Sequence, residues 1–321
     1  MRILITGGGG FLGQSVARAL LARGGLASEP GGRTALARLT LFDQAFSIEP
    51  IQDARVQYVT GDVLDRELLS RTCAAGVDAV FHLASVVSAG AEADFDLGMR
   101  VNLDGMRAVL DTCRRQNAPP RLVFTSSVAA FGGALPETVL DTTAATPQSS
   151  YGTQKVIGEL LVNDCTRKGY VDGRTLRLPT IVVRPGKPNR AASGFMSNIL
   201  REPIKGEAAV CPVPRDARMW ILSPQRAVDA LVHAMELPAG AWGGNRTLNA
   251  PGITVSVEQA LNALARIAGR DAAARVRFER DAAIENIVLS WPVQFATDRA
   301  ERLGFKADRG IDEIIEAHIR G

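Results

Sequence analysis

A glycine-rich turn between an apolar strand and an amphipathic helix limits the possible folds of this chain more than any other feature. Residues 2–6 have the pattern of a buried strand, and residues 11–23 have the apolar spacing of a helix. Glycines stand at positions 7, 10 and 13. In such a turn the first glycine permits the tight bend, the second lets backbone approach a pyrophosphate, and the third lets helix pack on strand. We therefore predict that Gly7, Gly10 and Gly13 form a dinucleotide-binding turn.

Strand and helix patterns alternate through the first half of the chain. A loop is expected at residues 24–32, which are rich in Gly, Pro and Ser. Further strands are expected at 39–42, 56–59, 79–85, 122–125 and 174–183. A long helix is expected to begin at or be capped by Asn102 and to end near Gln116. This alternation predicts an α/β fold, a Rossmann-type doubly wound parallel sheet with helices on both faces.

The second half of the chain has a mixed pattern. Two prolines and a glycine at residues 185–188 mark a departure from the sheet. We expect residues 1–183 to form the NAD-binding domain, with a strand near 246–250 returning to it. Residues 184–321 are then expected to form a smaller mixed C-terminal substrate-binding region.

An acidic residue at the end of the second expected sheet strand bears on cofactor choice. Asp43 follows the apolar run at 39–42. A carboxylate there accepts hydrogen bonds from ribose hydroxyls and repels a 2′-phosphate, which favours NAD over NADP. Glu29 is a second acid in this region, but it falls in the expected loop and not at a strand end.

A tyrosine and a lysine four residues apart carry the predicted chemistry. Tyr151 and Lys155 are spaced by about one helical turn and share a face. A free phenol has a pKa of about 10, and a neighbouring ammonium favours the phenolate, which makes the tyrosine a usable acid or base. Ser127 lies upstream, at the end of the expected strand 122–125. The carboxyl ends of parallel strands share one edge of a sheet, so Gly7, Asp43 and Ser127 are expected to meet there.

Composition and charge exclude several other classes of protein. The net charge of +3 and the absence of a run of five or six basic residues give no indication of nucleic-acid binding. The four cysteines are far apart, without metal-site or redox spacing, so we expect free thiols and no metal. Residues 1–3 lead directly into a strand, which does not fit a cleavable signal peptide, and the most apolar stretch, 77–91, is too short to span a bilayer. We expect a cytoplasmic protein.

Together these motifs resemble the extended short-chain dehydrogenases/reductases, in the NAD-dependent epimerase/dehydratase group. The resemblance covers nearly the whole chain. The markers are the turn at residues 6–13, Asp43, Asp62-Val63, His82-Leu83-Ala84-Ser85, Asn102, Ser127, the Tyr151/Lys155 pair, Arg184-Pro185-Gly186 and residues 297–305. The resemblance implies that Tyr151 is the acid/base. It also implies that Lys155 holds the nicotinamide ribose and tunes the tyrosine, and that Ser127 hydrogen-bonds the reacting oxygen.

The same resemblance implies an NAD site at the strand ends. Asp62 and Val63 are expected to flank the adenine, and the small residues Ala84 and Ser85 to let the cofactor lie over the strand end. His82 is expected to be a core histidine. The remaining expected cofactor contacts are Gly7, Gly10, Phe11, Leu12, Gly13, Leu83, Asn102, Thr125, Tyr151, Lys155, Pro179, Thr180 and Val182. A homodimer is expected through the helices after Asn102 and around Tyr151.

Two departures from the group narrow the activity. Sugar-nucleotide dehydratases have an Asp-Glu pair beside the catalytic hydroxyl, whereas residues 128–130 are Val-Ala-Ala here. Nucleotide-sugar enzymes usually have an aspartate where this chain has Ser223-Pro224-Gln225. Residues 177–193 resemble instead the D-erythronate dehydrogenase branch, and Ser290-Trp291-Pro292 resembles the short-chain L-threonine dehydrogenases. Both relatives oxidise a secondary alcohol on a small carboxylic acid.

We therefore expect an NAD-dependent dehydrogenase that oxidises the C2 hydroxyl of a small sugar acid such as D-erythronate. Its carboxylate is expected to bind an arginine from Arg184, Arg190, Arg215 and Arg218, with Arg218 the first choice. Ala191 and Ala192 suggest a pocket lined close to backbone. The other expected substrate contacts are Ser85, Ser127, Tyr151, Ser193 and Trp291. A sugar epimerase with tightly bound NAD, an L-threonine dehydrogenase and a non-enzymatic NAD-binding scaffold remain as alternatives.

Overall fold

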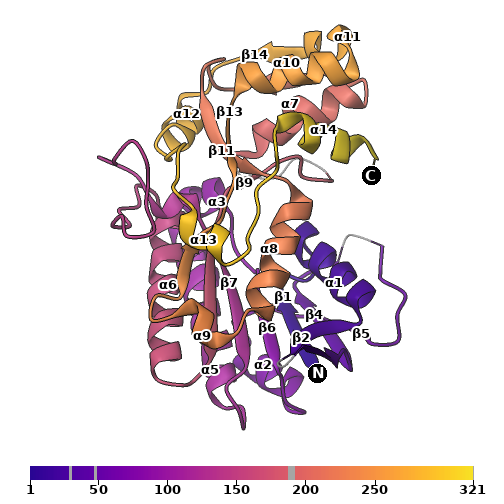
Figure 1. Ribbon diagram of the computed structural model, residues 1–321, viewed down its shortest axis with the longest axis vertical. Helices are drawn as coiled ribbons and strands as arrows, with labels where there is room; N and C mark the ends of the chain where they lie inside the picture. The colour runs from indigo at the N-terminus through magenta and orange to yellow at the C-terminus, as the bar shows by residue number, and fades with distance from the viewer. Residues whose placement is uncertain (29–30, 47–48, 187–191, 321) are drawn as a thin grey trace.

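The computed structural model describes residues 1–28, 31–46, 49–186 and 192–320. Its centre is a seven-stranded sheet in the order β12-β8-β7-β6-β1-β4-β5, and every neighbouring pair in it is parallel (Figure 1). The strands are β1 (Arg2–Thr6), β4 (Arg38–Asp43), β5 (Val56–Thr60), β6 (Ala79–His82), β7 (Arg121–Ser127), β8 (Asp172–Leu178) and β12 (Thr247–Asn249). The strand order reverses at β1, and this reversal opens a crevice at the carboxyl edge between β1 and β6.

Helices cover both faces of this sheet, because its strands are apolar on both sides. One face packs against α1 (Phe11–Arg23), α8 (Pro224–Glu236) and α13 (Asp298–Arg302). The other packs against α2 (Arg66–Thr72), α5 (Gly105–Arg114) and α6 (Ser150–Arg167). This three-layer arrangement confirms the predicted doubly wound α/β fold. Short helical segments connect the layers: α3 (Ser88–Ala93), α4 (Phe95–Gly98), a π-helix (Met99–Asp104), a 3₁₀ turn (Val128–Ala130) and α9 (Ala239–Trp242).

A smaller mixed unit stands over the carboxyl edge of the main sheet (Figure 1). It has its own apolar core, separate from the two layers around the sheet. Its helices are α7 (Gly194–Ile204), α10 (Val257–Ala268), α11 (Arg270–Ala274), α12 (Ala282–Val288) and α14 (Ile311–Arg320). Its strands are β9 (Thr180–Ile181), β11 (Arg218–Leu222) and β13 (Ile253–Ser256) in one sheet, with β10 (Ala209–Cys211) and β14 (Val276–Phe278) in another.

Three local expectations were wrong. Residues 24–32 are not a plain loop, because β2 (Gly25–Ser28) pairs antiparallel with β3 (Gly32–Ala35). The strand expected at 174–183 is interrupted at Pro179, which has no amide hydrogen to donate, and β9 then joins the smaller sheet. Asn102 does not start a helix, since it lies inside the π-helix that runs on into α5.

Candidate active site

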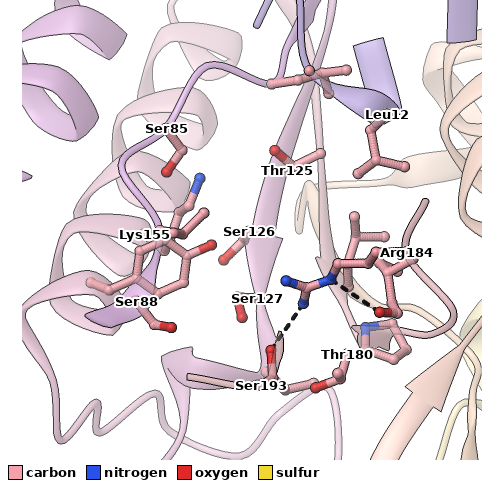
Figure 2. A pocket seen from close by; sticks show the side chains of 18 of the residues that line it. Leu12, Ser85, Ser88, Thr125, Ser126, Ser127, Lys155, Thr180, Arg184 and Ser193 are labelled. Carbon is pink, nitrogen blue, oxygen red and sulfur yellow. Dashed lines mark hydrogen bonds between the residues drawn. The ribbon is translucent and has the colours of Figure 1, made fainter. Parts of the chain in front are cut away.

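A cavity of about 290 Å³ lies where the smaller unit covers the carboxyl edge of the main sheet. Its floor is the β1–α1 turn and the ends of β6 and β7. Helix α6 forms the side next to these strands, and the opposite side comes from the segment after β9 and the region after α12. Figure 2 shows Ser85, Lys155 and Ser127 along one side and Arg184 reaching in from the other. The lining residues expected from the sequence are Gly7, Gly10, Phe11, Leu12, Gly13, Leu83, Ser85, Thr125, Ser127, Tyr151, Lys155, Pro179, Thr180, Ser193 and Trp291.

The glycine turn has the space that a pyrophosphate needs. Gly7 has φ +74°, and a Cβ there would lie 2.6 Å from the Ala84 backbone nitrogen, so only glycine fits the bend. At Gly10 a Cβ would meet only the Gly7 carbonyl oxygen, at 3.3 Å, so the space beside it is open toward the cavity. The α1 helix begins at Phe11, so its first amides face this open space. The turn therefore fits the phosphates of a dinucleotide.

Asp43 lies beside the turn, at the end of β4. Its Oδ2 accepts a hydrogen bond from the Gly9 amide at 2.8 Å, and its Oδ1 accepts one from the Gln44 amide at 2.7 Å. The carboxylate is half-buried and does not line the cavity itself. It is held at the sheet edge on the β4 side of the turn, where an adenosine ribose would continue from the pyrophosphate.

Helix α6 brings the tyrosine and the lysine to the cavity. The Ser149 hydroxyl caps the helix by accepting a hydrogen bond from the Gly152 amide at 3.1 Å, which fixes the first turn. Lys155 is buried, and its Nζ lies 5.4 Å from the Tyr151 ring centroid and 4.9 Å from that of Phe124. Burial lowers the pKa of Lys155 to about 7, although Glu159, one turn further along the helix, acts to raise it.

The electrostatics of Tyr151 differ from the sequence-based expectation. Burial raises the pKa of the phenol above its usual value, while the Arg184 charge and hydrogen bonds from Ser127 and Ser85 act to lower it. Lys155 is not among the groups that lower the pKa of Tyr151.

Arg184 is the cation that reaches into the cavity. Its Nε donates to the Ile181 carbonyl at 3.1 Å and its Nη2 donates to Ser193 Oγ at 2.9 Å (Figure 2). Burial lowers its pKa, and Tyr151 acts to raise it. Among the described residues no carboxylate pairs with this guanidinium. The sequence-based expectation had ranked Arg184 below Arg218 as the carboxylate-binding residue.

Several expected site residues lie outside the cavity wall. Arg218 is exposed at the start of β11, and Arg215 stacks its guanidinium 4.3 Å from the centroid of the Phe278 ring. Val182 is buried in the core of the smaller unit. Arg190, Ala191 and the rival acid Glu29 lie outside the described residues.

The other expected site residues that lie outside the cavity wall support the glycine turn and the strand ends. Asn102 is buried, and its Oδ1 accepts hydrogen bonds from the Val86 amide at 2.8 Å and from Ser85 Oγ at 3.0 Å. It therefore holds the segment after β6 in place. Ala84 backs the glycine turn. Asp62 Oδ1 accepts from the Leu64 amide at 2.9 Å, and Val63 is buried under α5. His82 is buried, as expected, with its Nδ1 2.7 Å from Thr6 Oγ1.

Six lining residues were not expected from the sequence: Val87, Ser88, Ser126, Val128, Leu178 and Ile181. Ser88 Oγ accepts a hydrogen bond from the Ala192 amide at 3.2 Å, which ties the start of α3 to the segment before α7. Ser126 directly precedes the expected Ser127, and its hydroxyl donates to Glu159 at 2.5 Å. A polar residue in the strand interior, facing α6 and not the apolar core, is the signal that could have found Ser126.

Comparison with known proteins agrees with this geometry. A family model described as the NAD dependent epimerase/dehydratase family matches residues 3–248. The chain belongs to this family. It is 54% identical over 319 residues to the D-erythronate dehydrogenase of Cupriavidus necator, covering 99% of this chain and 98% of that relative. It is 45% identical over 326 residues to the D-erythronate dehydrogenase of Haemophilus influenzae, covering 99% of each. The chain is therefore an oxidoreductase that uses a nicotinamide cofactor.

Solved structures agree on the fold of this family member. The crystal structure of a nucleoside-diphosphate-sugar epimerase from Agrobacterium tumefaciens superimposes with a TM-score of 0.92 at 41% identity, covering 100% of this chain and 94% of that one. A monomeric L-threonine 3-dehydrogenase from a metagenome has a TM-score of 0.86 at 22% identity, covering 99% and 97% of the two chains. Within the described part of the chain, no helix is both long and apolar enough to cross a membrane.

Proposed function

We propose that this family member is an NAD-dependent dehydrogenase that oxidises the C2 hydroxyl of D-erythronate, or a closely similar four-carbon sugar acid, to the 2-keto acid. The observation that carries the proposal is Arg184, a cation without a described carboxylate partner, facing Tyr151 and Ser127 across a small cavity. The two D-erythronate dehydrogenases that match nearly the full chain support the same substrate class.

The cofactor site would use the sheet side of the cavity. The turn from Gly7 to Gly13 would hold the pyrophosphate, and Asp43 would accept hydrogen bonds from the adenosine ribose. Asp43 favours NAD over NADP because a 2′-phosphate would meet its carboxylate. When bound, NAD supplies the acceptor for the hydride that leaves C2.

Tyr151 is the proposed acid/base of the reaction. Its phenolate would take the proton of the C2 hydroxyl as the carbon loses hydride. Ser127 and Ser85 both act to lower the pKa of the phenol, so both hydroxyls lie near it and could position the reacting oxygen. Lys155 would hold the nicotinamide ribose and, while charged, favour the phenolate.

Arg184 is the proposed carboxylate-binding residue, in place of Arg218. A guanidinium can donate two parallel hydrogen bonds to a carboxylate, which would orient C2 beside Tyr151. Arg184 is pre-oriented by Ser193 and the Ile181 carbonyl, so little side-chain entropy is lost when the acid binds. The exposed Arg218, at the start of β11, has no such place in the cavity.

Substrate turnover tests the proposal directly. NADH formation is measured with D-erythronate, L-threonine, erythritol and a UDP-sugar. We expect D-erythronate to give the highest kcat/KM, and erythritol, which lacks a carboxylate, to react poorly. Higher turnover of erythritol or of a UDP-sugar would rule out the carboxylate site. A preference for L-threonine by orders of magnitude would overturn the substrate and leave the chemistry in place.

A sugar epimerase is the second candidate, because the structure that superimposes at 41% identity carries that description. The two functions need the same tyrosine and lysine. They differ in net redox: an epimerase returns its hydride and accumulates no NADH. Interconversion of a UDP-sugar without NADH release would favour this candidate.

Three further expectations accompany the proposed function. Residues 1–183 with β12 would hold the cofactor and residues 184–321 the substrate. A homodimer would form through α5 and α6, in support of which Leu160 on α6 is 65% exposed and Phe95 on α4 is 58% exposed. Sedimentation of wild type and Leu160→Arg tests the dimer, and the cytoplasmic location remains an expectation.

A further inference from the structure

A buried ion pair lies on the same face of α6 as Tyr151 and Lys155, one turn further along the helix. Arg177 on β8 donates to Glu159 through Nε at 2.9 Å and through Nη2 at 2.6 Å, a bidentate arrangement. Ser126 Oγ donates to the same carboxylate at 2.5 Å. Glu159, Arg177 and Ser126 are 4%, 8% and 3% exposed. Burying such a pair costs desolvation of both ions, so its presence here is not explained by stability alone.

This pair is linked to the site through the register of the sheet. Ser126 is paired with Arg177 across β7 and β8, and the next residue of β7 is Ser127. The Arg177 guanidinium also lies 4.6 Å from the centroid of the Phe131 ring, and Phe131 follows β7 in the chain. Glu159 therefore reaches, through one hydroxyl, the backbone that presents Ser127 to the cavity.

Lys155 faces the same carboxylate from one helical turn away. Lys155 and Glu159 are both buried on the side of α6 that packs on β7 and β8. Among the described residues no carboxylate forms an ion pair with Lys155, and Glu159 is the charge that supports its protonated form. Burial lowers the pKa of Lys155 to about 7 even with that support.

Other charged and titratable groups around Lys155 are few. His82 on β6 is buried, and burial together with the Lys155 charge lowers its pKa to about 3, so it stays neutral. Tyr151 shares the helix, and Arg184 faces Tyr151 from across the cavity. Glu92 on α3 accepts a hydrogen bond from the Ser150 amide at the exposed start of α6. Four charged residues of α5 and the preceding π-helix are engaged in partly exposed ion pairs, and Arg100 of the π-helix is exposed: the paired residues are Asp104, Arg107, Asp111 and Arg114.

We propose that Glu159 and Arg177 are opposed positioning residues of the reaction, in which the Glu159 carboxylate keeps the Lys155 ammonium charged and Arg177 limits that effect by holding the carboxylate on β8. This inference rests on the proposed roles of Tyr151 and Lys155. A neutral Lys155 could not favour the Tyr151 phenolate, so the charge of Glu159 decides the pH range in which the pair works. Arg177 draws the carboxylate toward the sheet and so weakens its effect on Lys155.

The two halves of the pair therefore have opposite effects on Lys155. Glu159→Gln removes the favourable charge at constant shape, and the Lys155 titration should move down by about one to two pH units. Arg177→Met frees the carboxylate for Lys155, and the titration should move up. A purely structural ion pair would behave differently: both variants would lose stability, and neither would shift the lysine in a direction set by charge.

Lysine-selective NMR of the protein without substrate or cofactor measures this directly. The chain has five lysines, Lys155, Lys168, Lys187, Lys205 and Lys306, so ¹³Cε-labelled lysine gives few signals, and Lys155→Met assigns the buried one. The double variant Glu159→Gln/Arg177→Met should titrate like Glu159→Gln alone, because Arg177 acts through the carboxylate. Ser126→Ala, which changes no charge, keeps the test usable if a charge variant does not fold.

Asp172→Asn is the matched control. Asp172 accepts a hydrogen bond from the buried Arg174 at 2.7 Å, at the opposite end of the same strand. The substitution breaks a comparable ion pair on β8, and it should leave the titration of Lys155 unchanged. Shifts of the same sign in Glu159→Gln and Arg177→Met, or no shift in either, would overturn the proposal.

The pH dependence of kcat/KM separates this inference from the proposed function. On the alkaline side of this pH profile kcat/KM falls as Lys155 loses its proton. The pH of that fall should be lower in Glu159→Gln and higher in Arg177→Met. If the NMR shifts occur while Tyr151→Phe retains full activity, the proposed function fails and the charge coupling stands. If Tyr151→Phe is inactive and the pH of that fall does not change, the function stands and the coupling fails.

Discussion

The two walls of the active-site cavity are built in different ways. The sheet wall consists of backbone and small residues at strand ends, such as the Gly7 turn and Ser127, held by parallel pairing and by buried polar contacts. The opposite wall consists of long side chains, Arg184 and Trp291, carried by irregular segments of the smaller unit. A wall fixed by the fold suits a common cofactor, whereas a wall of loop side chains can change with the substrate.

Tyr151→Phe should give the largest effect and should affect chemistry alone. The ring keeps its packing on α6, so NAD binding should remain close to that of the wild type. Turnover should fall by about 10² to 10⁴-fold, the usual cost of losing general acid–base catalysis. Steady-state kinetics and cofactor titration by fluorescence measure the two quantities. Near-normal turnover would show that another group is the base.

Arg184→Gln should have the next largest effect and should act on the opposite wall. Losing a charged hydrogen-bond donor to the carboxylate costs about 1.5 to 3 kcal/mol, so kcat/KM for D-erythronate should fall roughly 10- to 150-fold. NAD binding should not change. Arg218→Gln is the control, since Arg218 is exposed and lies outside the cavity wall. Equal losses in both variants would mean that Arg184 has no specific role.

The same contrast explains what the sequence could predict. The glycine spacing and strand alternation sufficed for the doubly wound sheet, and the Tyr151/Lys155 spacing sufficed to place both side chains on one face of α6. These features have fixed periods, so they follow from local pattern. The position of Arg184 depends instead on how the segment after β9 folds back against α7, where Arg184 N bonds Ser197 Oγ at 3.0 Å. Such long-range packing has no local signature.

The electrostatics of the site were also beyond sequence reasoning. Tyr-x-x-x-Lys spacing indicates proximity, but the charge of a lysine depends on burial and on partners from other strands. Arg177 comes from β8 and meets Glu159 only because α6 packs on that strand. The same applies to Asn102: its residue type was noted, but its role in holding the segment after β6 comes from packing inside a helix.

Asp43→Ala should change the sheet wall and leave the opposite wall, with Arg184 and Trp291, unchanged. Removing the carboxylate removes its repulsion toward a 2′-phosphate, and the preference for NAD over NADP should fall by about tenfold. The variant also loses the acceptor for the Gly9 amide, so KM for NAD should rise. Measured kcat/KM with both cofactors, at saturating D-erythronate, gives the ratio. Equal use of both cofactors by the wild type would remove the basis of this prediction.

Trp291→Phe should give the smallest effect and is the most selective test of the two-wall division. Trp291 is half-buried, packs against the core of the smaller unit and lines the cavity with Ser193. Replacing indole by phenyl removes a modest apolar area worth about 1 kcal/mol, so kcat/KM for D-erythronate should fall roughly fivefold. The ratio of NAD to NADP use should stay constant, because no residue of the glycine turn is altered.

Asp43→Ala provides the reciprocal control, since it should change the cofactor ratio and leave the relative rates of D-erythronate and L-threonine unchanged. If Trp291→Phe alters cofactor preference as strongly as substrate preference, the two walls are coupled, and the indole contributes to both sites.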